Sequence, residues 1–197
     1  MVTDSNSTSL AQPDDIWLAG ARACISPNFN LRPEQTDVSL LVIHNISLPP
    51  GDFSSDAVER FFCNRLPADE HPYFAGIAQL QVSSHLFIRR SGELVQFVPL
   101  NRRAWHAGVS AFEGRQNCND YSIGIELEGT DDLPYTQAQY DVLAQVTRDI
   151  QRLFPAINGD RIVGHNDIAP TRKTDPGRAF DWAYYRAMIG ANNKQGQ

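Results

Sequence analysis

Cysteine is scarce in this sequence, and the cysteines that are present are widely separated. The chain has three, at Cys24, Cys63 and Cys118. An odd number at such spacings fits neither a disulfide framework nor a cysteine-based zinc site. We therefore expect free thiols, as is usual in a reducing compartment.

Long apolar runs and an excess of positive charge are lacking as well. No stretch approaches the roughly 20 apolar residues that a membrane-spanning helix needs. The chain does not start with a basic region followed by an apolar segment, as a secretory signal does. The net charge of −6 argues against a nucleic-acid partner. These absences favour a cytoplasmic protein that acts on neither membranes nor nucleic acids. We expect a monomer, although the sequence itself does not reveal the oligomeric state.

The remaining sequence has the composition and patterning of one globular domain. Its 197 residues suffice for a substantial core. Both ends are polar, so residues 1–15 and 191–197 are expected to be flexible tails around a domain at residues 16–190. The apolar pattern predicts strands at Val38–His44, His85–Arg90, Glu93–Pro99, Tyr121–Gly129 and Arg161–Val163. It predicts helices at Ile16–Ala23, Ser55–Arg65, Thr136–Phe154 and from about Asp181. Irregular structure is expected at Asn28–Asp37, His71–Tyr73 and Gly164–Gly177.

Two histidines are predicted to stand at strand ends. His44 closes a strand that is apolar on both faces, which is typical of the centre of a sheet. His165 follows the short strand Arg161–Val163. Ligands of open α/β sheets tend to bind beyond the carboxyl ends of strands, so both positions suit a metal or substrate site. A hydrogen bond to a neighbour is the simpler interpretation of either histidine alone.

The segment after His165 carries further polar side chains, among them Asp167, Lys173 and Asp175. Pro170 and Pro176 disfavour a regular helix there, because proline lacks the amide donor. Imidazole and carboxylate groups together suit zinc, and a lysine close to them could stabilise an oxyanion. An ordinary surface loop is the alternative.

The strand Tyr121–Gly129 alternates between apolar and polar residues, and it places Glu126 and Glu128 on one face, about 7 Å apart. A solvated face explains these two carboxylates most simply. Gly124 shares that face, however, and a glycine within a strand often marks the close approach of another group. A carboxylate that faces a cleft could act as a general base.

Together, these residues describe metal-assisted amide hydrolysis. His44, His165 and Asp175 supply three ligands and leave one zinc position open, as in catalytic sites. Zinc polarises a carbonyl and lowers the pKa of water to about 7. Glu126 would accept the water proton and pass it to the leaving amine. Lys173 would stabilise the oxyanion.

Several separated motifs carry a resemblance to a known family. They are Leu40–Pro50, His71–Phe74, Ala104–Gly108, Cys118–Thr130, Gly164–Pro170 and Arg172–Gly177. In this order they resemble the AmpD-type N-acetylmuramoyl-L-alanine amidases, and the likeness extends from about Trp17 to Trp182. It implies an α/β fold shared with peptidoglycan recognition proteins, in which helices flank a central mixed β-sheet, and one zinc ion.

The resemblance also implies roles for individual residues. It makes His44, His165 and Asp175 the zinc ligands, Glu126 rather than Glu128 the acid/base, and Lys173 the oxyanion-stabilising residue. It implies substrate contacts by Asn45, Trp105 and Arg115.

The implied substrate is a 1,6-anhydro-N-acetylmuramyl peptide, a small molecule that returns to the cytoplasm during peptidoglycan recycling. The implied bond joins the lactyl group of the sugar to L-alanine. Because such fragments are the inducing signal, a bearing on β-lactamase regulation follows in some organisms.

One departure from the family concerns the stem peptide. The family often has arginine where this chain has Gln81 and Asn117, positions expected near the carboxylates of the peptide. Arg115 or Arg172 could take over that contact. Peptide preference therefore stays open at this point.

Two other functions compete with hydrolysis. The first is a noncatalytic module that binds peptidoglycan fragments, although such members of the fold typically lack a zinc ligand. The second is an iron oxygenase, because His165 and Asp167 resemble half of a facial triad. The strong helix at Thr136–Phe154 argues against the all-β jelly roll that such an oxygenase would need.

Overall fold

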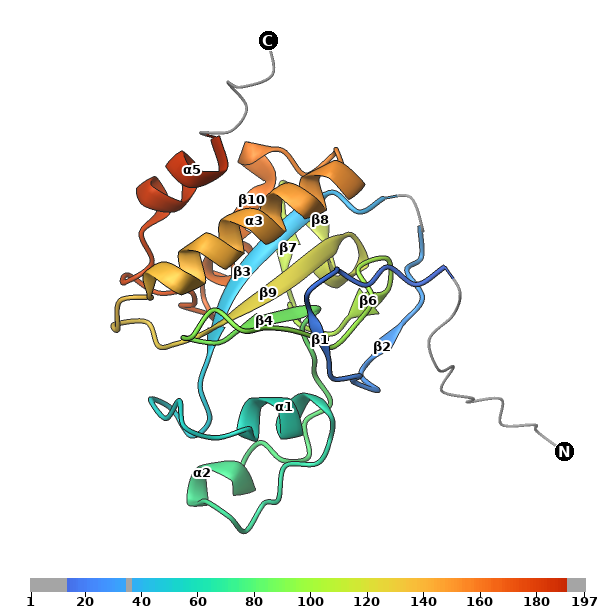
Figure 1. Ribbon diagram of the computed structural model, residues 1–197. Helices are drawn as coiled ribbons and strands as arrows, with labels where there is room; N and C mark the ends of the chain where they lie inside the picture. Colours follow the sequence, from blue (N-terminus) through green and yellow to red (C-terminus); the bar gives the residue numbers. More distant parts are fainter. Residues whose placement is uncertain (1–13, 35–36, 191–197) are drawn as a thin grey trace, which may run out of the picture.

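A mixed six-stranded sheet forms the centre of the molecule. The computed structural model describes residues 14–34 and 37–190 (Figure 1). The strands lie in the order β1 (Arg22–Ala23), β5 (Leu94–Gln96), β4 (Leu86–Ile88), β9 (Ser122–Glu128), β3 (Leu40–Ile46) and β10 (Ile162–Gly164). β4 and β5 pair antiparallel, and the other neighbours pair parallel. The expectation of an α/β domain with a mixed sheet is confirmed.

The two long strands β3 and β9 give the sheet two different faces. On one face, Leu41 and Ile43 join Ile123 and Ile125 in the largest apolar core. Side chains alternate along a strand, so the other face carries His44 together with the polar residues of β9. One face of the pair is therefore committed to the core, and the other is available for a site.

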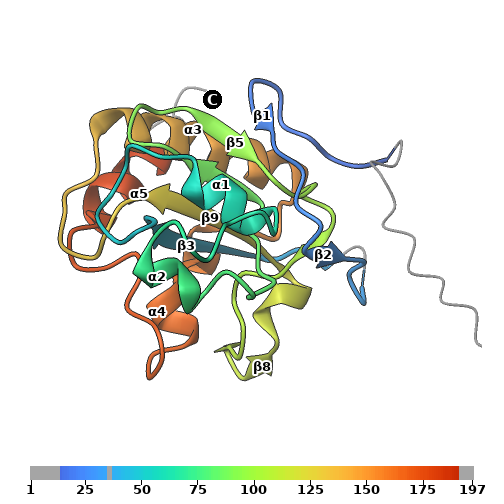
Figure 2. The same ribbon diagram turned by 90° about the horizontal axis from the view of Figure 1, so that it is seen from below.

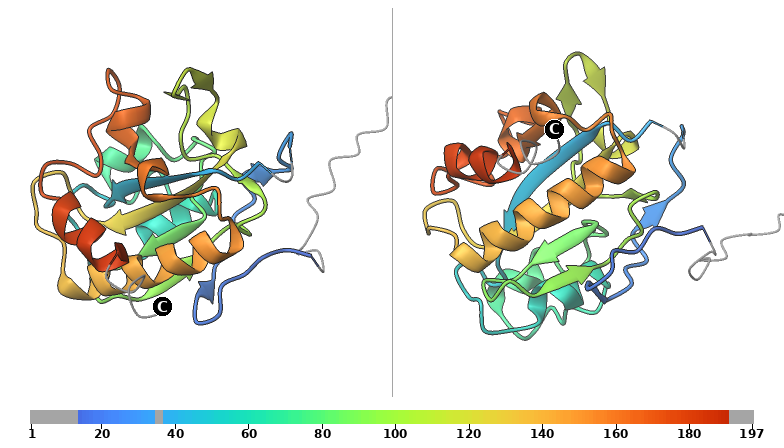
Figure 3. Two further views of the ribbon diagram at one scale, coloured as in Figure 1. Left: turned by 90° about the horizontal axis from the view of Figure 1, so that it is seen from above. Right: turned by 45° about the horizontal axis from the view of Figure 1, so that its top comes forward.

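A long helix covers the apolar face. α3 (Gln137–Leu153) begins at a capping box formed by Thr136 and Gln139, which satisfies amide donors that the helix leaves free. Its buried stripe packs on the sheet through Tyr140, Leu143, Val146 and Ile150. α5 (Trp182–Gly190) lies beside it (Figures 1 and 3).

Shorter helices lie on the opposite side. α1 (Ala57–Phe62) and α2 (Pro72–Ala75) stand in front of the sheet in Figure 2, and α4 (His165–Ile168) follows β10 directly. Phe61 and Phe62 of α1 pack with Phe87 and Phe97 in a second apolar core. The remaining short elements are β2 (Phe29–Asn30), β6 (Arg103–Ala104), β7 (Ala111–Phe112), β8 (Arg115–Gln116), η1 (Cys118–Asp120) and η2 (Gly159–Arg161).

Several local expectations were wrong. Ile16–Ala23 forms no helix; the segment is extended at its end and supplies β1, which pairs with β5. His71–Tyr73 is not a loop, because His71 caps α2 by accepting a hydrogen bond from the Tyr73 amide. Asn28–Asp37 contains the short strand β2, and Gly164–Gly177 begins with the helical turn α4. These elements are two to four residues long, which is too short for a periodic pattern to reveal.

The predicted tails lie mostly outside the described residues. Asp14 and Asp15 are described, and the carboxylate of Asp15 pairs with the guanidinium of Arg102. Residues 1–13 and 191–197 are outside the described part of the chain. Among the described helices, none is long and apolar enough to cross a membrane.

All three cysteines are free, as expected. The fold nevertheless brings the thiols of Cys24 and Cys63 to 3.5 Å from each other, although 39 positions separate them in the chain. This proximity arises because Cys24 packs against the second apolar core, which contains Cys63, and the spacing of the cysteines does not reveal it.

Candidate metal centre and active site

Three side chains from separate parts of the chain meet at the polar face of the sheet. His44 Nδ1 lies 2.9 Å from His165 Nδ1, and each nitrogen lies 3.0 Å from Asp175 Oδ2. These are the three residues that the sequence predicted as metal ligands, and the structure brings them together as one potential metal-binding group.

The pairing of β10 with β3 brings the two histidines together. Gly164 lies opposite Ile43 in this parallel ladder, so the next residue on each strand, His165 and His44, also fall side by side. α4 then turns the chain away, and the carboxylate of Asp167 accepts a hydrogen bond from the Gly164 amide at 2.7 Å. Asp167 thus caps this turn, and it does not belong to the cluster.

Asp175 is held by hydrogen bonds on both sides of it. Its carbonyl accepts a hydrogen bond from the Asn166 amide at 3.0 Å. The hydroxyl of Tyr135 donates to the carbonyl of Pro176 at 2.8 Å. Gly177 adopts a φ of +79°, and a Cβ there would come within 2.1 Å of the Asp131 backbone. The loop therefore has a defined path that aims the carboxylate at the histidines.

The charges in the cluster follow from its burial. Burial lowers the pKa of His44 to about 4, because a low-dielectric site disfavours the charged imidazolium. Burial alone would raise the pKa of Asp175, but the close polar contacts of its carboxylate with His165 and then His44 outweigh it and hold that pKa below its usual range. At neutral pH the cluster therefore combines a neutral His44 with a carboxylate.

The hydrogen bonds around the cluster show that it fits a cation. His165 Nε2 lies 3.1 Å from the carbonyl oxygen of Ala107 and 3.4 Å from Arg172 Nη2. The carbonyl is the nearer of the two and can only accept, so we assign the ring hydrogen to Nε2 and a lone pair to Nδ1. Asp175 is an acceptor only. Lone pairs therefore converge on one point and need a positive charge between them. Two imidazoles and a carboxylate form a donor set that zinc accepts.

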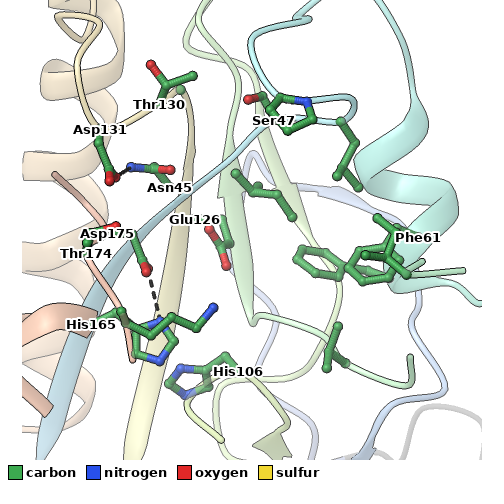
Figure 4. Close-up of a pocket in the computed structure, with 18 of the residues that line it drawn as sticks. Asn45, Ser47, Phe61, His106, Glu126, Thr130, Asp131, His165, Thr174 and Asp175 are labelled. Atoms are coloured by element: carbon green, nitrogen blue, oxygen red, sulfur yellow. Dashed lines mark hydrogen bonds and ion pairs between the residues drawn. The ribbon is translucent and has the colours of Figure 1, made fainter. Parts of the chain in front are cut away.

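Glu126 stands beside this cluster with one oxygen unused. It lies opposite His44 in the β3–β9 ladder, its side chain is buried, and Oε2 has no hydrogen-bond partner among the described residues. Burial raises the pKa of its carboxyl well above the usual value, and the charge of Asp175 adds to that rise. In Figure 4 the carboxyl points into the cavity, with Asp175 on one side and Phe61 on the other.

Glu128 has a different environment on the same strand. Its two oxygens accept hydrogen bonds from the Arg89 guanidinium at 3.2 Å and the Arg90 amide at 2.9 Å. The interpretation of this strand face as solvated was wrong, since Glu126 and Glu128 are both buried. Only Glu126 of the two lines the cavity.

The cavity next to the cluster has a volume of about 670 Å³, which is within the range of small-molecule sites. One side is apolar and includes Leu48, Phe61, Phe62, Ile77 and Leu80; the other side is polar and includes Asn45, Glu126, Asp131, His165, Arg172, Lys173 and Asp175. The cavity therefore offers apolar contact on one side of its reactive groups and hydrogen bonding on the other.

Two of the three predicted substrate-binding residues line the cavity. Asn45 and Trp105 line the cavity, where Asn45 Nδ2 donates to Asp131 Oδ1 at 2.9 Å. Arg115 is not among the lining residues. Its guanidinium pairs with Asp37 and lies 4.0 Å from the centre of the Tyr121 ring. Any contact of Arg115 with substrate stays a prediction.

Two neighbours of the cluster were not predicted as site residues. His106 lines the cavity, and its Nδ1 lies 2.9 Å from His44 Nε2. A Cβ on Gly124 would lie 2.6 Å from the His106 ring, which confirms that this glycine marks a close approach. Nothing in the sequence marked Tyr135 as a residue that holds the Asp175 loop, apart from its position just before α3. The signal for His106 was the segment Ala104–Gly108, whose tryptophan and histidine could both line a cleft, but only Trp105 was predicted to contact substrate.

Comparison with known proteins gives a consistent result. The profile of the N-acetylmuramoyl-L-alanine amidase family matches residues 34–178. The 1,6-anhydro-N-acetylmuramyl-L-alanine amidase AmpD of Citrobacter freundii is 56% identical over 176 residues, which cover 89% of this chain and 94% of that protein. A crystal structure of a selenomethionine derivative of AmpD superposes with a TM-score of 0.87 at 55% identity, covering 91% of this chain and 99% of that one.

A more distant neighbour was solved with a ligand. The amidase AmiD of E. coli, in complex with the substrate anhydro-N-acetylmuramic acid-L-Ala-D-γ-Glu-L-Lys, superposes with a TM-score of 0.58 at 31% identity. The match covers 77% of this chain and 57% of that one.

Proposed function

The chain belongs to the AmpD-type N-acetylmuramoyl-L-alanine amidases, and from this premise we propose that it is a zinc-dependent hydrolase of 1,6-anhydro-muropeptides. The bond cut joins the lactyl group of N-acetylmuramic acid to L-alanine. The observation that carries the proposal is the convergence of His44, His165 and Asp175 beside the unpartnered carboxyl oxygen of Glu126.

His44, His165 and Asp175 would hold the metal through Nδ1, Nδ1 and Oδ2, the atoms that converge in the structure. When bound, zinc supplies Lewis-acid chemistry, which polarises a carbonyl and lowers the pKa of water to about 7. Three protein ligands are the usual number in catalytic zinc sites. The ligand set therefore supports a catalytic rather than a structural role.

Glu126 is proposed as the acid/base. Its free oxygen can accept a proton from the attacking water and return it to the amine that leaves as the amide bond breaks. Lys173 lines the cavity and opposes the rise in the pKa of Glu126 through its charge. A cation so placed suits the negative charge that develops on the carbonyl oxygen.

The substrate class follows from the family and from the two-sided cavity. The apolar side suits the sugar ring and the polar side suits the lactyl-peptide bond. Asn45 and Trp105 are the proposed contacts, and Arg115 remains a prediction outside the cavity. Arg172, which lines the cavity, is the better placed of the two arginines to meet a stem-peptide carboxylate.

The biological setting is also a proposal. We place the enzyme in the cytoplasm as a monomer, acting on a small molecule in peptidoglycan recycling, with residues 16–190 as the zinc amidase domain. In organisms where these fragments induce β-lactamase, the enzyme would also affect β-lactamase regulation. AmpD relatives that cover most of this chain support the recycling role.

One assay tests the reaction. Zinc-loaded protein is incubated with an anhydromuramyl tripeptide, with and without a chelator, and the products are read by mass. We expect free tripeptide and anhydromuramic acid, formation that stops with chelator, and recovery on addition of zinc. Intact substrate that still binds would instead favour the noncatalytic peptidoglycan-binding module.

A further inference from the structure

We propose that Ser122 and His106 form a hydrogen-bond relay that fixes the tautomer of His44, so that His44 Nδ1 presents its lone pair to the metal. Both are positioning residues in this role. The inference rests on the proposed zinc function for its purpose, but the placement of hydrogens stands on contacts within the chain.

The relay begins at a carbonyl group. Ser122 Oγ lies 2.5 Å from the carbonyl oxygen of Cys118 and 3.0 Å from His106 Nε2. A hydroxyl has one hydrogen, and a carbonyl can only accept. The serine hydrogen therefore goes to Cys118. His106 Nε2 must then carry a hydrogen and donate it to Ser122.

The second step passes through the imidazole of His106. A neutral ring with its hydrogen on Nε2 has a lone pair on Nδ1. That nitrogen lies 2.9 Å from His44 Nε2, so His44 Nε2 is the donor and carries the hydrogen. His44 Nδ1 is left with a lone pair, and it is this atom that faces His165 and Asp175.

The packing around His106 keeps the relay in place. Its backbone amide donates to Asn119 Oδ1 at 3.1 Å. Its ring packs edge-on against His44, with centroids 5.1 Å apart, and the backbone of Gly124 lies so close that a Cβ would come within 2.6 Å. A ring enclosed in this way has little room to turn over.

The relay matters because His44 has two possible tautomers. With its hydrogen on Nδ1, His44 could not offer a lone pair to a cation until that hydrogen moved. Hydrogen-bond partners that orient a metal-binding histidine typically change metal affinity by about 10–100-fold. His165 is oriented in the same way: the Ala107 carbonyl accepts the hydrogen of its Nε2, and its Nδ1 faces Asp175.

The first test removes the far end of the relay. In Ser122→Ala, His106 Nε2 has no acceptor, so its hydrogen is free to move to Nδ1 and reverse the bond to His44. We expect zinc affinity, measured by competition with a chromophoric chelator, to fall by about 10-fold or more. Ser26→Ala is the matched control, because Ser26 is equally buried and also donates to a carbonyl at 2.5 Å. Its zinc affinity should stay unchanged.

The second test separates hydrogen bonding from shape. Asparagine and leucine have nearly the same shape, but only asparagine offers an oxygen close to the position of His106 Nδ1. We expect His106→Asn to keep more zinc affinity than His106→Leu. Equal affinity in Ser122→Ala, His106→Leu and the parent, all folded by circular dichroism, would overturn the inference.

A third measurement reads the tautomer directly. In metal-free protein the relay competes with Asp175 Oδ2, an acceptor 3.0 Å from His44 Nδ1. Nitrogen-15 spectra of the histidine rings should nevertheless show His44 and His106 protonated at Nε2 in the parent, and a mixture with Nδ1 in Ser122→Ala. A hydrogen on Nδ1 of His44 in the parent would overturn the inference. If the parent bound no zinc, the proposed function would fail, and these spectra would still decide where the hydrogens lie.

Discussion

Glu126 lies directly opposite His44 in the parallel ladder between β9 and β3. Register partners on neighbouring strands point to the same face of a sheet, so the proposed base and a proposed metal ligand share one rigid platform. Neither depends on a loop for its position. The geometry of the proposed site is therefore built mainly by strand pairing, and only Asp175 and Lys173 come from a loop.

Glu126→Gln tests the acid/base role, because it removes proton transfer and keeps the size of the side chain. We expect zinc affinity to stay close to that of the parent and kcat to fall by about 10²–10⁴-fold. Glu128→Gln is the control: its partners are Arg89 and Arg90 outside the cavity, so it should lose stability more than turnover. Full activity in Glu126→Gln would remove this residue from the mechanism.

Asp175→Asn tests the metal site against the oxygenase alternative. We expect loss of most zinc binding, measured by metal content after dialysis, because the carboxylate that neutralises the cation is gone. Asp167→Asn should retain zinc, since Asp167 caps α4 through the Gly164 amide. The reverse outcome, with zinc lost only in Asp167→Asn, would point to the facial triad.

Strong periodic patterns in the sequence were sufficient to predict the elements that carry the site. The alternation of Tyr121–Gly129 and the apolar run before His44 predicted β9 and β3, because seven-residue strands contain enough repeats to define a face. The resemblance then selected Glu126 over Glu128. The burial and partners of the two carboxylates agree with that choice.

Contacts between distant segments had no such signal. The edge strand β1 depends on pairing with β5, and the relay from Ser122 to His106 joins residues 16 positions apart through side chains alone. Gly124 was the one hint, since the absence of a side chain implied a close neighbour without naming it. The pairing of Arg115 with Asp37 is another such contact, since nothing in the sequence spacing indicated it.

Lys173→Met tests the oxyanion role. Methionine keeps much of the length of lysine and removes its charge, so the stabilisation of a developing negative charge would be lost. We expect kcat to fall by about 10²–10³-fold, with zinc content unchanged because Lys173 is not part of the metal cluster. A change in KM alone would assign Lys173 to substrate binding.

Glu59→Gln tests how stability depends on pH. A hydrogen bond from Arg22 lowers the pKa of Glu59 to about 2 despite opposing burial, and Arg89 adds to this effect. A carboxyl whose pKa is lowered by folding stabilises the fold fully when the pH is above its unfolded pKa, here 4.5. That stabilisation is lost as the pH falls toward the folded pKa of about 2. Urea unfolding should show Glu59→Gln less stable than the parent at pH 7, with a smaller difference at pH 3. Glu113→Gln, an exposed partner of Arg161, should show little difference at either pH.

Gly124→Ala tests whether the close approach of His106 to β9 is needed for metal binding. The added Cβ would lie 2.6 Å from the His106 ring, so the ring must shift and its contacts with Ser122 and His44 would be disturbed. Such overpacking typically costs about 1–3 kcal/mol, and we expect a lower zinc affinity as well, because the relay is broken at its centre. Gly159→Ala is the control, since its Cβ would meet nothing within 4 Å. If Gly124→Ala lost stability but kept full zinc affinity, the glycine would serve packing alone, and His106 would hold His44 without the support of β9.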